Sequence, residues 1–153
     1  MTPADVQATA RLARTTDLAG VLALYRALRP GDPELSEEEG RAAFERVLGD
    51  GSLSLVVCER GGVLASTCML AVIANLASGA RPFGVIEHVV ALPQFRRQGL
   101  ARLALRHALE LAWSRQCYKV VLLSGADRTE AHRLYESVGF RADVERGFVA
   151  KRG

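Results

Sequence analysis

The residues that decide the fold are Val89 to Ala101, which read V-V-A-L-P-Q-F-R-R-Q-G-L-A. An apolar, strand-like run ends at Pro93, a short basic turn follows, and Gly99-Leu100-Ala101 opens a helix. The first turn of a helix leaves several backbone N–H groups without partners, and the helix dipole makes this end positive. With Arg96 and Arg97 just before it, this helix start predicts a site for a phosphate group.

The composition is that of a protein with an ordinary hydrophobic core. The chain has 153 residues, of which 49% are hydrophobic, and a net charge of +3. This length predicts a single domain over residues 1–153. The weakly basic charge suits an anionic small ligand and does not by itself predict nucleic-acid binding. No apolar run is long enough to cross a membrane, and the N-terminus lacks a signal-peptide pattern. We therefore expect a cytoplasmic protein without a membrane partner.

The cysteines and histidines favour neither a disulfide nor a metal site. The three cysteines show no C-x-x-C spacing, and the three histidines form no closely spaced pair. Free cysteines in such a sequence usually behave as small buried hydrophobes. We therefore expect three buried thiols and no metal.

Hydrophobic periodicity and turn signals predict an α+β fold around one mixed sheet. Gly61-Gly62 marks a hairpin, and two capping boxes, Ser36 with Glu39 and Asp127 with Glu130, mark helix starts. The expected order is β-α-α-β-β-β-α-β-α-β-β. In that order, strands are predicted over 8–14, 53–59, 63–74, 85–92, 118–123, 140–143 and 147–151, and helices over 16–28, 36–48, 99–115 and 127–139.

A second motif follows the first by about thirty residues, where residues 131–140 read A-H-R-L-Y-E-S-V-G-F. Together the two motifs resemble the GNAT superfamily of acetyl-CoA-dependent N-acetyltransferases, and the predicted order of elements is similar to that fold along nearly the whole chain. The family pattern Arg/Gln-x-x-Gly-x-Gly/Ala is matched at Arg96, Gly99 and Ala101. The pattern Ala-x-x-Leu/Phe-Tyr-x-x-x-Gly-Phe is matched at Ala131, Leu134, Tyr135, Gly139 and Phe140.

The resemblance implies acetyl-CoA as the acetyl donor, without a metal, and a splay between the fourth and fifth strands. The pantetheine arm would enter this splay and pair with the strand backbone. The pyrophosphate would lie on the amides of the basic turn. Family members often carry an asparagine near the start of the last helix, where this chain has Arg128, and an arginine there could reach a phosphate. The expected acetyl-CoA-binding residues are Val89, Val90, Leu92, Arg96, Arg97, Gln98, Gly99, Leu100, Ala101 and Arg128.

The resemblance also implies two catalytic side chains, Glu87 and Tyr135. Acetyl transfer to an ammonium group needs a base for the nitrogen and a proton for the departing thiolate. Glu87, the charged residue beside the splay, would act as the base directly or through water, and the Tyr135 phenol would act as the acid. A backbone N–H of Val89 or Val90 would stabilise the oxyanion. Glu87 as a structural carboxylate and Tyr135 as a core side chain are the alternatives. Strand alternation predicts that His88 faces away from Glu87, as a core or interface residue.

The sequence leaves the acceptor open. Ile86 to Val90 is locally similar to the strand of N-acetyltransferases that act on amino-sugar phosphates, so a small primary amine, such as an amino sugar or its phosphate, is the first hypothesis. The acceptor would lie near the first two helices and residues 75–83. A non-catalytic acyl-CoA sensor or assembly module is the alternative. We expect no nucleic-acid partner, and a homodimer stays open. Polar candidates for the acceptor region are Arg26, Arg29, Glu34, Asn75 and Arg81.

Overall fold

The computed structural model describes residues 7–153 and contains one five-stranded mixed sheet. The strand order is β1-β2-β3-β4-β5; neighbours are antiparallel except β4 and β5, which are parallel. The strands are β1 (Thr9–Leu12), β2 (Leu53–Arg60), β3 (Val63–Ile73), β4 (Phe83–Ala91) and β5 (Val120–Leu122). The α-helices are α1 (Leu18–Leu28), α2 (Glu37–Gly49), α3 (Ala77–Ala80), α4 (Leu100–Ser114) and α5 (Thr129–Ser137), with 3-10 turns η2 (Thr15–Asp17) and η3 (Pro93–Phe95).

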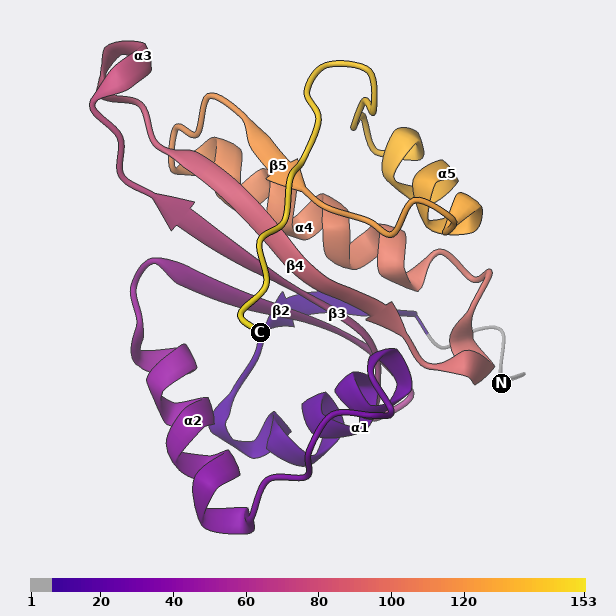
Figure 1. The fold of residues 1–153 in the computed structure, drawn as a ribbon. Helices are drawn as coiled ribbons and strands as arrows, with labels where there is room; N and C mark the ends of the chain where they lie inside the picture. Colours follow the sequence, from indigo (N-terminus) through magenta and orange to yellow (C-terminus); the bar gives the residue numbers. More distant parts are fainter. Residues whose placement is uncertain (1–6) are drawn as a thin grey trace.

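Two layers of helices enclose the sheet (Figure 1). The helices α1 and α2 pack on one face, where Val21, Leu24 and Phe44 meet apolar residues of β2, β3 and β4. The helix α4 packs on the other face through buried small and branched residues such as Ala104, Leu105 and Ala108. This arrangement places the N-terminus of α4 next to the end of β4, as the sequence predicts.

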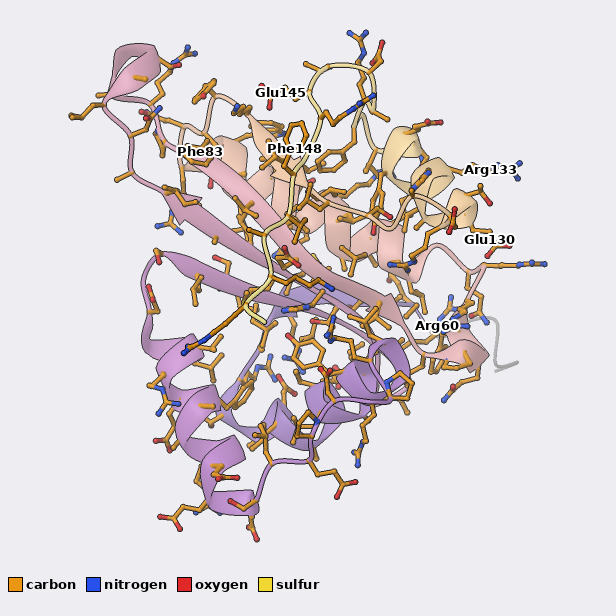
Figure 2. The ribbon with its side chains drawn as sticks, viewed as in Figure 1. Arg60, Phe83, Glu130, Arg133, Glu145 and Phe148 are labelled. Carbon is orange, nitrogen blue, oxygen red and sulfur yellow. The ribbon has the colours of Figure 1, made fainter. Side chains whose placement is uncertain are left out.

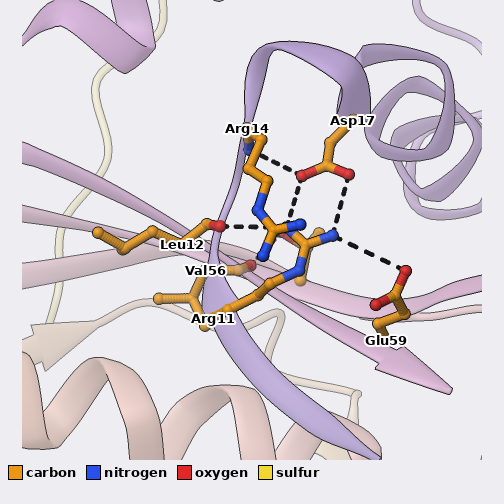
Figure 3. Close-up of polar contacts among 7 residues, drawn as sticks. Arg11, Leu12, Arg14, Asp17, Val56 and Glu59 are labelled. Carbon is orange, nitrogen blue, oxygen red and sulfur yellow. Dashed lines mark hydrogen bonds and ion pairs between the residues drawn. The ribbon is translucent and has the colours of Figure 1, made fainter.

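A part-buried arginine holds the connection between β1 and α1 (Figure 3). Arg11 donates to both carboxylate oxygens of Asp17, at 2.7 and 3.1 Å, and the backbone N–H of Arg14 donates to the same carboxylate at 2.7 Å. Glu59 of β2 lies 3.8 Å from the other side of the Arg11 guanidinium. The cluster fixes where α1 starts relative to the sheet.

The sequence predicts most of these elements correctly. The Ser36 hydroxyl accepts from the Glu39 N–H, and the Glu39 carboxylate accepts from the Ser36 N–H, so the capping box at α2 is confirmed. All three cysteines are free and buried. The expected box of Asp127 and Glu130 is wrong, because α5 begins after Arg128 without a side-chain cap.

The two closing strands, 140–143 and 147–151, are also wrong, because the described structure ends in an extended tail over residues 141–153 without strand pairing. Arg141 pairs locally with Asp143, at 2.8 Å, instead of joining a ladder. The tail still runs along β5 (Figure 1): Glu145 lies 3.2 Å from Lys119, and a Cβ on Gly147 would collide with Leu123. Bends at residues 142–144 interrupt the extended run, and the segment is exposed along its length, so little burial would stabilise a strand pair at this edge.

Within residues 7–153, none of the helices combines the length and the apolar character that crossing a bilayer requires. The same residues bring no three His, Cys, Asp or Glu side chains together in a group that could hold a metal ion.

Candidate active site

The parallel strands β4 and β5 separate after a short contact. They pair only at Gly84–Val120, Val85–Val121 and Ile86–Leu122, although β4 continues to Ala91. Beyond Ile86, the edge of β4 therefore has no strand beside it, and its backbone groups are available to another extended chain. This is the splay that the sequence predicts.

The splay opens into a groove of about 800 Å³ that joins the end of β4, the start of α4 and the start of α5. Its volume is in the range of small-molecule and cofactor sites. The groove is lined by Ala27, Leu28, Val89, Val90, Ala91, Phe95, Arg96, Arg97, Gly99, Leu100, Ala101, Arg102, Asp127, Arg128, Thr129, Glu130, Ala131, Arg133, Leu134 and Tyr135.

The N-terminus of α4 forms one end of the groove. Gly99 precedes the helix with φ of +76°, a left-handed conformation that glycine adopts without a steric penalty. No atom lies within 4 Å of the place where a Cβ would stand, so the space over this residue is open. The amides of the first turn, which have no partners inside the helix, can thus be approached from the groove.

The groove is strongly basic, with five arginines against two carboxylates. Arg97 and Glu130 pair across its mouth at 3.1 Å, but both side chains are at least 80% exposed, so this ion pair contributes little to stability. Glu130 and Arg133 project from the first turns of α5 (Figure 2). An anion that enters the groove therefore meets arginines from two elements together with the positive end of α4.

Most of the expected donor-binding residues line this groove, but two do not. The Gln98 side chain donates to the Gln94 carbonyl and accepts from Arg60, which draws it toward the β2–β3 hairpin. Leu92 donates its backbone N–H to the Ala65 carbonyl at 2.9 Å, and its own carbonyl accepts from Phe95. Both backbone groups of Leu92 thus have partners within the protein.

Sequence reasoning missed two of the arginines in the groove, Arg102 and Arg133. Helical periodicity assigns Arg102 to the exposed face of α4, yet its Nε is buried without a partner and the residue lines the groove. Its position in the first turn of α4, three residues after Gly99, is the signal that could have identified it. For Arg133, no signal in the sequence distinguishes it from a surface side chain.

Tyr135 is buried at the inner end of the groove, with its ring 6.2 Å from that of Phe140. Burial raises the pKa of the Tyr135 phenol, and the charge of Glu87 adds to this rise, whereas nearby Arg128 and the Ser124 hydroxyl act against it. The Ser124 hydroxyl is itself buried and has no hydrogen bond of acceptable geometry. The phenol therefore stays protonated at neutral pH and can donate a proton.

Glu87 and His88 lie at an irregular point of β4. Thr67 of β3 pairs with Val90, but Met69 pairs with Glu87, so two residues of β4 oppose Cys68 alone. This is a β-bulge, and His88 within it has φ of +56°. A bulge interrupts the two-residue alternation of side chains, which is why the sequence-based assignment of His88 to the opposite face fails.

Both residues instead turn toward α1. The His88 imidazole stacks at a tilt on Tyr25, with ring centroids 5.4 Å apart and planes at 59°. The hydrogen bond to Asp32 raises the pKa of Arg29 at the end of α1, and the charge of the exposed Glu87 carboxylate adds a smaller rise. Glu87 lies directly opposite Met69 of β3, and Met69 packs in the cluster under α1 and α2, so the carboxylate is on the same side of the sheet as the imidazole.

Three of the five polar candidates for acceptor binding have partners of their own. Arg29 pairs with Asp32 at 2.8 Å, and the Arg81 Nε donates to the Ser78 carbonyl at 2.8 Å. The Asn75 side chain closes a local turn with Ala77. None of the three is held toward the groove.

A splayed β4 and β5, a basic helix N-terminus and a tyrosine on the next helix define a transferase that takes a CoA thioester. The match to the family model described as "Acetyltransferase (GNAT) family" covers residues 21–140, and the chain belongs to this family. The protein is accordingly an acetyltransferase that uses acetyl-CoA as its donor.

Individual relatives agree with this assignment. A glucosamine 6-phosphate N-acetyltransferase of Trypanosoma brucei brucei is 30% identical over 133 residues, which cover 86% of this chain and 88% of the relative. A provisionally assigned acetyltransferase of Agrobacterium tumefaciens strain C58 has a TM-score of 0.90 and 39% identity, covering 94% of this chain and 99% of its own. The structure of a Trypanosoma brucei acetyltransferase has a TM-score of 0.82 and 28% identity, covering 95% and 100%.

Proposed function

We propose that the protein transfers the acetyl group of acetyl-CoA to a primary amine of a small molecule, by direct attack while both substrates are bound. The observation that carries this proposal is that a single groove connects the splayed edge of β4, the basic start of α4 and the buried Tyr135. These features suit the three parts of the donor: the extended arm, the phosphates and the thioester.

The binding roles follow from the lining of the groove. The β4 backbone at Val89 and Val90 is proposed to pair with the arm of the donor, and one of these N–H groups is proposed to stabilise the oxyanion. Amides from Arg97 to Ala101 are proposed to hold the pyrophosphate, with Arg96 and Arg128 beside it. The five arginines of the groove support this assignment.

The catalytic roles are assigned to Glu87 and Tyr135. Glu87 is exposed, so it is proposed to remove the proton of the acceptor ammonium directly or through a water molecule. Tyr135 is proposed to give its proton to the sulfur that departs. Support comes from the charge of Glu87, which adds to the rise that burial causes in the pKa of the Tyr135 phenol.

An amino sugar or its phosphate is the first acceptor to test, because the Trypanosoma brucei brucei relative is named a glucosamine 6-phosphate N-acetyltransferase. The test is the release of CoA from acetyl-CoA with glucosamine 6-phosphate, glucosamine, a polyamine, an aminoglycoside, free amino acids and a peptide N-terminus. We expect the largest kcat/KM with one of the two amino sugars. Faster acetylation of the peptide than of every small amine would reject the proposed acceptor class.

A homodimer in the cytoplasm is the setting we propose for this activity. The three free thiols agree with a reducing compartment. For the dimer, support comes from apolar side chains beside the edge strand β5: Leu123, Val144, Phe148 and Val149 are all more than half exposed. Exposed apolar residues gathered at a sheet edge favour association with another chain.

A further inference from the structure

The bulge in β4 places two neighbouring ionisable side chains on one face of the sheet. In a regular strand Glu87 and His88 would face opposite sides. Around the bulge, Ile86 and Val89 both pack toward α4. Glu87 lies opposite Met69, which packs on the α1 side, and His88 stacks on Tyr25 of α1. Backbone in a sparsely populated conformation is often found at functional sites, because the surrounding structure must hold it there.

The acetylation of an ammonium group gives this pair a task. The nitrogen starts with three protons and ends, as the amide, with one. The first proton must leave before attack; the second leaves as the new C–N bond forms and the C–S bond breaks. The sulfur takes one proton from Tyr135, so one proton goes to solvent and one must restore the phenol. Two proton acceptors beside the amine fit this balance better than a single carboxylate.

We propose that His88 is a second acceptor-side residue, which contacts the attacking amine together with Glu87 and takes one of its protons. This inference rests on the proposed function and adds a residue that neither motif includes. Tyr25 holds one face of the imidazole from α1, and the residue as a whole is half-buried. The left-handed backbone at His88 thus places the imidazole on the same side of the sheet as Glu87.

The ionisable groups beside the imidazole are Tyr25 on α1 and Glu87 on β4 itself; Cys68, opposite the bulge on β3, turns its Sγ toward the Ala104 carbonyl of α4. Burial raises the pKa of Tyr25 and of Cys68 to about 12 in each case. Neither group, nor an arginine, can produce an inflection in the rate below pH 8. The contributions of Glu87 and His88 to the pH dependence of the rate are distinguished by comparing variants at the two positions.

The test compares His88→Asn and His88→Gly with Tyr25→Phe. Asparagine and glycine both accept the left-handed backbone and remove the titratable ring, and Tyr25→Phe keeps the ring that packs on His88. We expect kcat/KM for the amine to fall by about a hundredfold in both His88 variants. The pH dependence of the rate should also differ from that of the wild type, because the imidazole no longer takes part in proton transfer. Tyr25→Phe should keep the wild-type kcat/KM and the wild-type pH dependence. CoA affinity from calorimetry and the melting temperature should be unchanged in all three variants.

Wild-type kcat/KM and an unchanged pH profile in the His88 variants would overturn the inference and leave the proposed function intact. A second outcome would also overturn the inference: a wild-type pH dependence in the His88 variants, with the rate, CoA affinity and melting temperature all lowered together. His88 would then be structural. A wild-type protein that binds CoA and acetylates no amine would overturn the proposed function and this inference with it.

Discussion

The Asp17 carboxylate is the most strongly held charge at the residue scale. It accepts three hydrogen bonds from Arg11 and from the Arg14 backbone, and its side chain is only 10% exposed. These bonds, above all those from the Arg11 guanidinium, hold the pKa of Asp17 below its ordinary value. The resulting stabilisation is present above the ordinary pKa of about 4 and is lost as the pH falls through the lower value of the folded state.

We therefore expect Asp17→Asn to lower the free energy of unfolding by about 1 to 3 kcal/mol at pH 7. The difference from wild type should shrink as the pH is lowered from about 5 to about 2. Urea unfolding at several pH values measures both effects. The matched control is Asp143→Asn, which breaks an exposed ion pair with Arg141 and should have no measurable effect. A difference for Asp17→Asn that grows toward acid pH would contradict this account.

Arg128 is the residue at which this chain departs from the family pattern. It lines the groove, and its charge reaches Tyr135. Arg128→Ala should weaken CoA binding by about tenfold, as expected for one charge-assisted hydrogen bond to a phosphate. Arg106→Ala is the control, because Arg106 is an exposed arginine on α4 outside the groove. Calorimetric titration with CoA at two salt concentrations distinguishes them; equal losses in the two variants would indicate only a general effect of charge.

At the scale of elements, the start of α4 is the proposed binding site for the phosphates of the donor. Gly99 has a left-handed backbone and open space where a side chain would stand. Gly62, in the hairpin between β2 and β3, has almost the same φ, +78°, and equally open surroundings, but it is not part of the groove. Comparing substitutions at the two glycines thus distinguishes the cost of backbone strain from a direct effect on CoA binding.

Gly99→Ala and Gly62→Ala should each lower the free energy of unfolding by about 1 kcal/mol, through the same left-handed strain. Only Gly99→Ala should weaken CoA binding, because its methyl group occupies space over the first amides of α4. Chemical denaturation and calorimetry measure the two quantities. An equal loss of CoA affinity in both variants would show that the open space at Gly99 is not where the phosphates bind.

Several elements with a strong local signal could be predicted from the sequence, although the box of Asp127 and Glu130 is wrong. Features that depend on distant partners could not be predicted. The box of Ser36 and Glu39 and the turn before α4 are local, and both are found in the structure. The bulge at His88 has no local signal, because it comes from the register of β3 against β4. For the same reason, the alternation of apolar residues after Phe140 suggests strands that find no ladder at the edge of β5.

For the whole molecule, the tail along β5 is the feature on which the proposed dimer depends. Glu145 anchors the tail to Lys119, and Phe148, further along the tail, is 88% exposed (Figure 2). If a second copy covers this surface, sedimentation should give a dimer for the wild type and a shift toward monomer for Phe148→Asp, with CoA affinity unchanged. Arg152→Asp, an exposed change of charge in the same tail, is the control. A wild-type monomer at all concentrations would contradict the proposed dimer.

The central claim for the molecule as a whole is that different residues carry out donor binding and acetyl transfer. We propose that the groove with its arginines binds the donor, whereas Glu87 and Tyr135 act only on the reaction. The side chains exchanged in Glu87→Gln and Tyr135→Phe keep nearly the same shape and lose the proton-transfer group. The two variants therefore test chemistry without removing a wall of the site.

The most direct measurement is acetyl transfer by wild type, Glu87→Gln and Tyr135→Phe with the best acceptor amine, alongside CoA affinity for all three proteins. We expect each variant to lose about a hundredfold or more in kcat. CoA affinity should stay within about twofold of wild type, a change of less than 0.5 kcal/mol in binding free energy. Wild-type kcat in both variants, or losses of kcat that follow losses of CoA affinity, would contradict the claim.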